Sequence, residues 1–419
     1  MNLNTQLLHG NFKCEDKTGA TLAPIYQSSA FGKSSAEEIE KIFNNELPGF
    51  AYSRISNPTT FAFEQRITYI ENGISSTATS SGMSAISMTF LNIVRSGDEI
   101  ISTTSIFGGT LDLWSNLKKL RITVKFVDEI TEESLSKAVS SKTKAVFAET
   151  IGNPKLNVTD IKKAADAAHK LNLPFILDNT AATPYLVTGI PLGADIVINS
   201  TSKYINGHSS SIGGIITDGG KFDWNNGNYP SLDKYKKYGK LAFSAALKND
   251  TLRNYGACIS PQNSFLNSIG LETLGLRMER HCENALRLAQ CMENKPGIHS
   301  VNYPLLDTNP WHDIAKKQFG GKGGGIFTMR LYTKHRAFEF IDRLKYAIII
   351  TNIGDTKTLV VHPSSTIYAH SDNRTKEKAG VYDDMIRISV GIEDIDDLIS
   401  DFTDALEYVN TKYGNEVSE

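Results

Sequence analysis

The sequence predicts an α/β protein, with a large domain on a mostly parallel sheet and a smaller α+β domain at the C-terminal end. Three observations support this prediction. Apolar segments of strand length alternate with helical segments from Phe61 onward. A long helical stretch, Phe265 to Met292, then changes the character of the chain. The chain of 419 residues is longer than a typical domain with a single hydrophobic core, which favours two domains.

The first half of the chain carries the alternation. Helical spacing of apolar residues predicts helices at Ala62 to Tyr69, Met83 to Val94 and Thr159 to Leu171. Short apolar runs predict strands at Glu99 to Thr103, Ile122 to Val127, Ala145 to Glu149, Pro174 to Asp178 and Asp195 to Asn199. Such alternation implies a mostly parallel sheet with helices on both faces. Ligands of these sheets bind outside the carboxyl ends of the strands, so polar residues there are candidates for a site.

The two ends of the chain differ from this middle part. About sixty residues at the start show no strong periodicity and predict an arm over the surface. The C-terminal part mixes predicted strands at Gly325 to Leu331, Thr358 to His362 and Met385 to Val390 with predicted helices at Arg336 to Leu344 and Ile395 to Asn410. The polar tail, Thr411 to Glu419, is predicted to fray. The predicted domains are an arm at residues 1–60, a large domain at 61–258 and a C-terminal domain at 259–419.

Composition indicates a small-molecule substrate. Charged residues make up 21% and the net charge is −2, so nothing favours nucleic acid or an anionic membrane. The four cysteines, Cys14, Cys258, Cys282 and Cys291, form no C-x-x-C pair and predict reduced thiols. The start lacks the pattern of a signal peptide, and no apolar run reaches membrane-spanning length. We therefore expect a cytoplasmic protein that binds neither nucleic acid nor membrane.

Lys203 and Asp178 follow neighbouring predicted strands. Lys203 lies in NSTSKYINGH, directly after an apolar strand, where partial desolvation favours the neutral amine that a Schiff-base lysine needs. Asp178 ends the preceding strand, at the same edge of the sheet. A carboxylate there suits the ring nitrogen of pyridoxal phosphate (PLP), which it would keep protonated. Taken singly, the lysine is better explained as a surface residue after a strand, and the aspartate is explained equally well as a turn or capping residue.

Two further features suit an anionic ligand. The segment Thr79 to Ala85 leads into a predicted helix, whose first backbone N–H groups would cradle a phosphate, and Ser200 and Ser202 could add hydroxyl donors. Arg387 alternates with apolar residues in MIRISV, so an inward guanidinium could hold a carboxylate with two parallel hydrogen bonds. The plain alternatives are a capping turn without a ligand and an outward arginine on a half-exposed strand.

Together these residues resemble a known family. YSRISNP, DNTAATP, NSTSKYINGH and RISVGIED stand in the order found in the Cys/Met-metabolism (trans-sulfuration) family of PLP enzymes, of fold type I. The resemblance runs from about Gly10 to Asp397. It implies that Lys203 is the Schiff-base lysine and Asp178 the pyridinium partner. It also implies a phosphate cradle made of Ser81, Gly82, Met83, Ser200 and Ser202.

The resemblance assigns further residues and an assembly. Tyr52 and Arg54 match a pair that reaches the phosphate of a neighbouring subunit, which implies at least a dimer and usually a homotetramer. Arg387 matches the residue that binds the substrate α-carboxylate. Asn153 and Asn352 lie where the family contacts cofactor and substrate, and Tyr52 is also implied in substrate binding. Glu149 ends a strand that faces the same region.

Three segments favour one branch of the family. Leu252 to Ala285, Asn352 to Thr366 and the region Asp218 to Ser244 resemble O-acetylhomoserine sulfhydrylases. Gly109 occupies the place where methionine γ-lyases carry a cysteine. The ring that stacks on PLP is usually tyrosine, and here the matching residue is Phe107. Stacking survives without the hydroxyl, which fits acetate, a leaving group that needs little help.

The resemblance implies replacement at Cγ of O-acetyl-L-homoserine by sulfide or methanethiol, giving homocysteine or methionine and acetate. Lys203 would then carry protons between Cα and later intermediates. Methionine γ-lyase, cystathionine γ-synthase and O-succinylhomoserine sulfhydrylase are the alternatives within the family.

Two unrelated alternatives have some sequence support. Ser200-x-x-Lys203, Ser371 to Asn373 and Lys17 to Gly19 match the three short motifs of Ser-Lys acyl-transfer enzymes. Their order along the chain is wrong, however, and the residues after Lys203 do not predict the helix that this mechanism requires. The cluster Gly320 to Gly325 could suggest a dinucleotide loop, but a strand rather than a helix is predicted after it.

Overall fold

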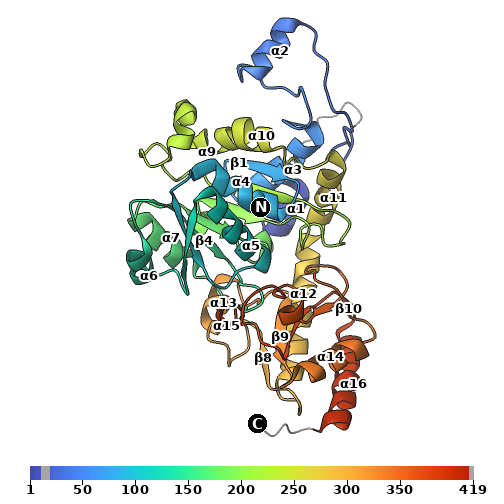
Figure 1. Ribbon diagram of the computed structural model, residues 1–419. Helices are drawn as coiled ribbons and strands as arrows, with labels where there is room; N and C mark the ends of the chain where they lie inside the picture. The colour runs from blue at the N-terminus through green and yellow to red at the C-terminus, as the bar shows by residue number, and fades with distance from the viewer. Residues whose placement is uncertain (11–18, 415–419) are drawn as a thin grey trace.

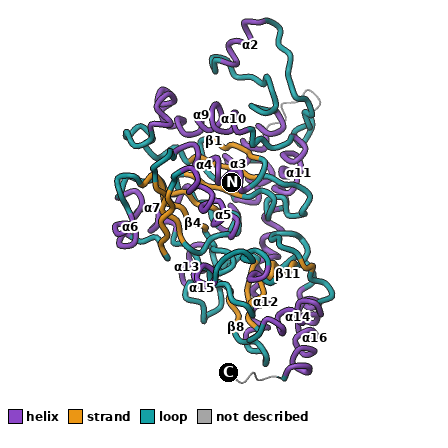
Figure 2. Tube along the Cα trace, viewed as in Figure 1, coloured by secondary structure: helices purple, strands orange, loops and turns teal. Residues whose placement is uncertain are grey.

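The computed structural model describes residues 1–10 and 19–414. Figures 1 and 2 show two sheets, a seven-stranded one in the first half of the chain and a five-stranded one nearer the C-terminus. The larger sheet has the order β1-β7-β6-β5-β4-β2-β3. Its strands are β1 Ser75–Thr79, β2 Glu99–Thr103, β3 Thr123–Val127, β4 Thr143–Glu149, β5 Phe175–Asp178, β6 Ile196–Asn199 and β7 Gly214–Asp218. Only β7 runs antiparallel among these described strands, which confirms a mostly parallel sheet.

Each face of the larger sheet packs against helices, because successive side chains of a strand point to opposite faces. On β4, Val146 enters one core and Phe147 the other. Helix α4 (Gly82–Ile93) covers the Phe147 face, and α3 (Pro58–Ile70) covers the opposite face. The other helices of this half are α5 Gly108–Leu117, α6 Glu132–Ala138, α7 Ile161–Lys170 and α8 Thr183–Leu186. Burial on both faces explains the continuous apolar runs that predict these strands.

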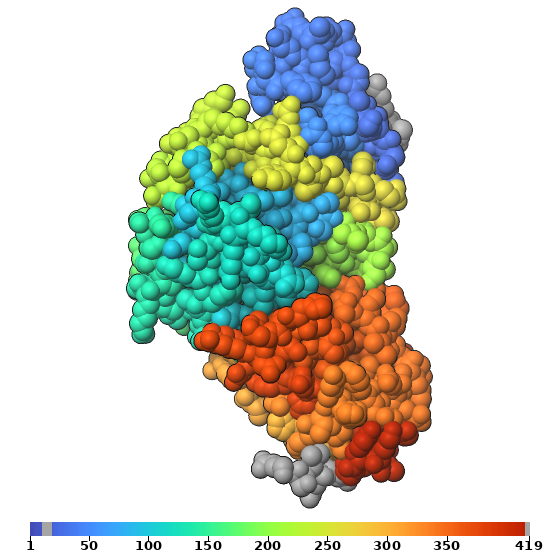
Figure 3. All heavy atoms as spheres, in the orientation of Figure 1, coloured from blue at the N-terminus to red at the C-terminus, as the bar shows by residue number. Residues whose placement is uncertain are grey.

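The smaller sheet has the order β10-β11-β12-β9-β8 and is mostly antiparallel. Its strands are β8 Ser300–Asn302, β9 Ile326–Arg330, β10 Ile348–Ile349, β11 Leu359–Val361 and β12 Met385–Ser389. The helices around it are α13 His312–Gln318, α14 Lys334–Arg343, α15 Asn373–Lys378 and α16 Ile395–Tyr413. In Figure 3 this orange and red part packs directly against the green and teal part that contains the larger sheet.

The long helical stretch Phe265 to Met292 is two helices, so the prediction of one continuous helix is wrong. Helix α11 (Pro261–Glu272) ends at Thr273, whose N–H bonds the Gly270 carbonyl at 3.3 Å, and α12 (Leu274–Glu293) follows. The start of α12 packs in the core of the larger sheet, and its end packs in the core of the smaller one. Both sheets therefore share α12. The division at residues 60 and 258 stays a prediction.

Several elements escape the sequence patterns. The strand β1 is SSTAT, whose Ser and Thr side chains hide a buried strand, and β7 begins with glycine. The first sixty residues, where no strong periodicity was visible, contain the helices α1 (Leu3–His9) and α2 (Ala36–Phe43). Ser35 caps α2 by accepting the Glu38 N–H at 3.1 Å, a spacing that sequence reasoning could have used. In Figures 1 and 3, α2 projects from the body of the chain.

Shorter helical segments connect the sheets and the arm. These are α9 Ala242–Ala246, α10 Arg253–Tyr255, a π-helix at Leu247–Leu252 and 3₁₀ segments at Lys118–Leu120, Ile190–Leu192, Pro230–Leu241 and Pro363–Ser365. Three residues of the tail predicted to fray, Thr411 to Tyr413, belong to α16 instead.

Cys14, Lys17, Thr18 and residues 415–419 lie outside the described residues. The other cysteines, Cys258, Cys282 and Cys291, are free thiols. Within the described ranges, no helix is long and apolar enough to cross a bilayer. The same ranges contain no group of side chains arranged to hold a metal ion.

Candidate active site

One cavity of about 430 Å³ lies at the carboxyl ends of β4, β5 and β6, where the loop before β11 meets the larger sheet. Its lining includes most of the residues singled out from the sequence: Ser81, Gly82, Met83, Phe107, Glu149, Asn153, Asp178, Ser200, Ser202, Lys203, Asn352 and Arg387. Residues far apart in the chain therefore meet at the sheet edge where α/β proteins bind ligands.

Tyr52 and Arg54 are the two predicted residues that do not line this cavity. Tyr52 lies on the arm with 41% of its surface exposed. The Arg54 guanidinium lies 5.4 Å from the Tyr52 ring and donates to the Arg253 carbonyl. Neither residue therefore contributes to the cavity of its own chain.

Lys203 lies in a turn that follows β6. Its Nζ donates to Asn352 Oδ1 at 2.5 Å. Burial, together with the positive charge of Arg387, lowers the pKa of Lys203 to about 8. A substantial fraction of the amine is therefore neutral near physiological pH, as a nucleophile or proton acceptor requires.

Asp178 ends β5 and is held by a local turn. Its Oδ1 accepts the Thr180 N–H at 2.9 Å and the Thr180 hydroxyl at 2.5 Å. Burial raises the pKa of Asp178, and the two bonds from Thr180 oppose that rise. Thr180 Oγ1 also accepts the Ser200 N–H at 2.8 Å, so one threonine links the carboxylate to the Lys203 segment. Sequence reasoning missed Thr180, although an aspartate two residues before a threonine is a common Asx-turn signal.

Glu149 ends β4 and pairs with Asp178 in the sheet register. Its Oε1 accepts the Phe107 N–H at 2.6 Å. Burial raises the pKa of Glu149 well above its ordinary value, and the neighbouring Asp178 adds to this. Two buried carboxyl groups at adjacent strand ends favour a ligand that brings a positive charge, and a protonated pyridine ring is such a ligand.

The start of α4 provides an anion site. Ser81 caps the helix by accepting the Ser84 N–H at 3.0 Å, and the first-turn N–H groups have no acceptor within the helix. A Cβ at Gly82 would lie 2.5 Å from the Ser200 Cβ, so a residue without a side chain is required for this close approach. Ser202 Oγ accepts the Gly213 N–H at 2.9 Å, which fixes its hydroxyl at the same end of the cavity. This cradle has the chemistry of a phosphate site.

Arg387 points inward from β12, as predicted for an anion-binding arginine, and is 2% exposed. Its two terminal nitrogens donate to Asn153 Oδ1 at 3.1 Å and to the Asn352 carbonyl at 3.0 Å. Its Nε is buried without a hydrogen-bond partner among the described residues. A buried guanidinium with a free N–H fits a carboxylate ligand, because an unpaired buried donor is costly.

Phe107 is the N-cap residue directly before α5, and it lines the cavity. A Cβ at Gly109 would lie 2.6 Å from the ring, so the absence of a side chain at 109 leaves room for this ring position. Apolar wall residues such as Ile151 and Ile353 complete the lining.

The structure does not assemble the acyl-transfer alternative. The residues after Lys203 form turns rather than a helix. Asp372, in the Ser371 to Asn373 motif, caps α15 by accepting the Thr375 N–H at 2.7 Å, and this motif lies outside the cavity lining. The glycine cluster Gly320 to Gly325 precedes the strand β9, so it does not open a helix as a dinucleotide loop does.

The fold is shared with solved structures over nearly the whole chain. A Campylobacter jejuni protein described as an O-acetylhomoserine (thiol)-lyase, crystallised with N'-pyridoxyl-lysine-5'-monophosphate, has a TM-score of 0.93 at 33% identity, covering 97% of this chain and 100% of its own. Cystathionine gamma-lyase from Lactobacillus plantarum, complexed with L-serine, has a TM-score of 0.85 at 31% identity, covering 98% of this chain and 100% of its own. The predicted fold type I is confirmed by these likenesses.

Sequence comparison also finds similar proteins over nearly the whole chain. The homocysteine synthase of Schizosaccharomyces pombe is 38% identical, with 96% of this chain and 97% of that protein covered. The O-acetyl-L-homoserine sulfhydrylase of Corynebacterium glutamicum is 39% identical, with 95% of each covered. The family described as Cys/Met metabolism PLP-dependent enzyme matches residues 4–407. Because that match spans nearly all of the sequence, this chain belongs to the Cys/Met metabolism family of PLP-dependent enzymes.

Proposed function

We propose that this chain catalyses replacement at Cγ of O-acetyl-L-homoserine, with sulfide or methanethiol as the incoming group and homocysteine or methionine and acetate as products. The observation that carries the proposal is the meeting of Lys203, Asp178 and Arg387 around one cavity. The named sulfhydrylase relatives, similar over nearly their full length, support the choice of reaction.

The cavity residues fit PLP. Lys203 would hold the cofactor through its amine, and Asp178 would pair with the ring nitrogen. Phe107 would stack on the ring, with Asn153 beside it. The phosphate would bind in the cradle formed by Ser81, Gly82, Met83, Ser200 and Ser202. When bound, PLP supplies an electron sink that stabilises negative charge at the substrate Cα.

The chain itself positions the substrate and moves protons. Arg387 would bind the α-carboxylate, using the Nε that has no partner in the described residues. This contact places Cα toward Lys203, whose neutral Nζ accepts the Cα proton and can return it at a later atom. Burial and the neighbouring Asp178 raise the pKa of Glu149, which favours the uncharged form of Glu149 beside the Asp178 carboxylate.

The apolar wall protects the reaction from water. Met83, Ile151 and Ile353 line the cavity, and Phe107 closes part of it without contributing a hydroxyl. Water would otherwise divert the substrate toward an oxo acid and ammonia, the γ-lyase outcome. Acetate leaves as a stable anion, so the absence of a phenol at position 107 suits an O-acetyl substrate.

The active assembly is proposed to be a homotetramer in the cytoplasm. Tyr52 and Arg54 lie on the arm and away from the cavity of their own chain. They are therefore free to complete the phosphate site, and in the case of Tyr52 the substrate site, of a neighbouring copy. The free thiols of the described cysteines agree with a reducing compartment.

The test compares kcat/KM for three reactions: O-acetylhomoserine with sulfide, O-succinylhomoserine with sulfide, and methionine alone. We expect the first to be preferred. A preference for methionine breakdown would assign the chain to the γ-lyase branch, and a preference for the succinyl ester would assign it to the succinyl-using branch. A Lys203→Ala variant should lose both activity and the visible band of the cofactor.

A further inference from the structure

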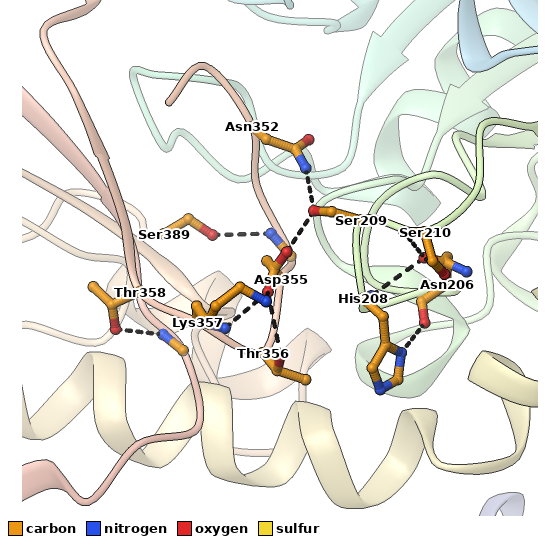
Figure 4. Close-up of polar contacts among 12 residues, drawn as sticks. Asn206, His208, Ser209, Ser210, Asn352, Asp355, Thr356, Lys357, Thr358 and Ser389 are labelled. Carbon is orange, nitrogen blue, oxygen red and sulfur yellow. Dashed lines mark hydrogen bonds and ion pairs between the residues drawn. The ribbon is translucent and has the colours of Figure 1, made fainter. Parts of the chain in front are cut away.

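The Lys203 amine is connected to a buried carboxylate outside the catalytic cavity. Lys203 Nζ donates to Asn352 Oδ1, and Asn352 Nδ2 donates to Ser209 Oγ at 3.0 Å. Ser209 Oγ in turn donates to Asp355 Oδ2. Figure 4 shows Ser209 placed between the Asn352 amide and the Asp355 carboxylate. Four side chains therefore form one continuous chain of hydrogen bonds.

Asp355, at the end of this series of hydrogen bonds farthest from Lys203, decides which group donates in each bond. Asp355 is 3% exposed, and its Oδ1 accepts the Lys357 N–H at 2.9 Å and forms an ion pair with Lys357 Nζ at 2.7 Å. Burial acts to raise the pKa of Asp355, but these contacts with Lys357 and Ser209 lower it below its ordinary value. An ionised carboxylate only accepts hydrogen bonds, so the Ser209 hydroxyl must donate to it.

This constraint decides which end of the Asn352 amide meets Lys203. Because the Ser209 proton is used by Asp355, the Ser209 oxygen can only accept a bond from its other neighbour. Asn352 must then offer its NH₂ group to Ser209, which leaves its oxygen facing Lys203 Nζ. The opposite orientation would place the amide NH₂ group against Lys203 Nζ, donor against donor, and the amide oxygen against the Ser209 oxygen, acceptor against acceptor.

The loop that carries Asn352 and Asp355 is held against the Lys203 turn by the backbone as well. The Thr356 N–H bonds the Gly207 carbonyl at 3.0 Å. Gly354 has a φ of +76°, and a Cβ there would lie 2.6 Å from the Tyr204 nitrogen, so this approach requires glycine. The hydrogen-bonded side chains of Lys203, Asn352, Ser209 and Asp355, called the relay below, thus connect the Lys203 turn with the loop of Asn352 and Asp355. Backbone contacts fix the spacing of these two segments independently of the side chains.

We propose that Ser209 and Asp355 are positioning residues that orient the Asn352 amide so that its oxygen accepts from Lys203. This inference rests on the proposed role of Lys203 as the amine that holds the cofactor and moves protons. An amide oxygen stabilises the ammonium form of Lys203 and opposes Arg387, which favours the neutral form. The relay therefore sets how readily the amine gives and accepts a proton.

The experiment measures the pKa of Lys203 in the full-length protein freed of PLP, by competitive acetylation at a series of pH values and mass spectrometry of the Lys203 peptide. Ser209→Gly removes the hydroxyl, and the φ of +52° at this position suits glycine. Asp355→Asn is the second variant. Ser210→Gly is the matched control, because the Ser210 hydroxyl bonds Asn206 and not Asn352.

We expect Ser209→Gly and Asp355→Asn each to lower the Lys203 pKa by about one unit, the value of one charge-assisted hydrogen bond. Ser210→Gly should leave it unchanged. In the holoenzymes, α-proton exchange of a bound amino acid in D₂O should fall about tenfold for the first two variants only. Lys203 pKa values equal to wild type in both folded variants would overturn the proposal.

A double variant separates orientation from a merely structural effect. Asn352→Asp replaces the amide by a carboxylate, whose two oxygens both accept, so no orientation is needed. We expect the Ser209→Gly effect to shrink below about 0.3 pKa unit in this background. An undiminished effect would refute orientation as the cause. If borohydride reduction fixes the cofactor to another residue, the proposed function fails, whereas the Lys203 pKa still tests the relay.

Discussion

The cradle at the start of α4 gives a sharp prediction for Gly82→Ala. An added Cβ would lie 2.5 Å from the Ser200 Cβ, 2.8 Å from its Oγ and 3.1 Å from its Cα. Ser200 cannot easily move away, because its N–H donates to Thr180 Oγ1 at 2.8 Å. Overpacking of this kind costs about 1–3 kcal/mol. If this cost destabilises the PLP-bound protein and not the cofactor-free protein, the Kd for PLP rises about fivefold to 150-fold.

The assay is a titration of cofactor-free protein with PLP, followed by absorbance, with circular dichroism to confirm that each variant is folded. Gly82→Ala combined with Ser200→Gly removes the two closest contacts, so in the Ser200→Gly background the added methyl group should cost little further PLP affinity. A folded Gly82→Ala protein that binds PLP as tightly as wild type would refute the placement of the phosphate at this helix. If Gly82→Ala weakens PLP binding as much in the Ser200→Gly background as in wild type, the steric explanation is refuted.

Three further predictions concern Arg387, Lys203 and the buried core residue Phe147. Arg387→Lys keeps the charge but loses the fork of donors, so kcat/KM for O-acetylhomoserine should fall about tenfold to a hundredfold; a change below threefold would exclude Arg387 as the carboxylate ligand. The pKa of Lys203 is about 8 in the fold and 10.5 ordinarily, so between these pH values the unfolded chain binds more protons and stability rises with pH. Urea titrations of cofactor-free protein should show this rise, of roughly 3 kcal/mol, in wild type and not in Lys203→Met. Phe147→Ala removes a fully buried ring packed 5.5 Å from Trp114 and should cost about 3–5 kcal/mol, whereas Phe126→Ala, at a 45% exposed site, should cost less than about 0.5 kcal/mol in the same denaturation assay.

The predictability of each element followed its burial. Strands such as β4 and β6 are apolar on both faces because both faces are covered, so their runs are visible in the sequence. The strand β1 is equally buried, but its polar side chains bond partners on other elements, as Ser76 Oγ does with Thr217 Oγ1 at 2.9 Å. Thr217 belongs to β7, far along the chain, so no local sequence pattern predicts this contact.

The residues of the candidate site also differ in whether the sequence could predict them. Lys203 and Asp178 could be predicted because each directly follows an apolar strand, and parallel strands bring their carboxyl ends to one edge. Ser209 and Asp355 could not, because their importance lies in hydrogen bonds to distant partners rather than in their own chemistry. Asp355, for example, stands 146 residues from the serine that donates to it.

The sequence by itself determined the family and its cofactor, because the motifs that resemble the family are short runs of residues along the chain, and from that resemblance it predicted the residues of the candidate site. Only the tertiary structure decided which way the Asn352 amide points, that Tyr52 and Arg54 lie away from their own cavity, and that two carboxyl groups share a strand edge. Hydrogen-bond direction and desolvation depend on distances between segments remote in sequence, and those distances exist only after the sheets have packed together.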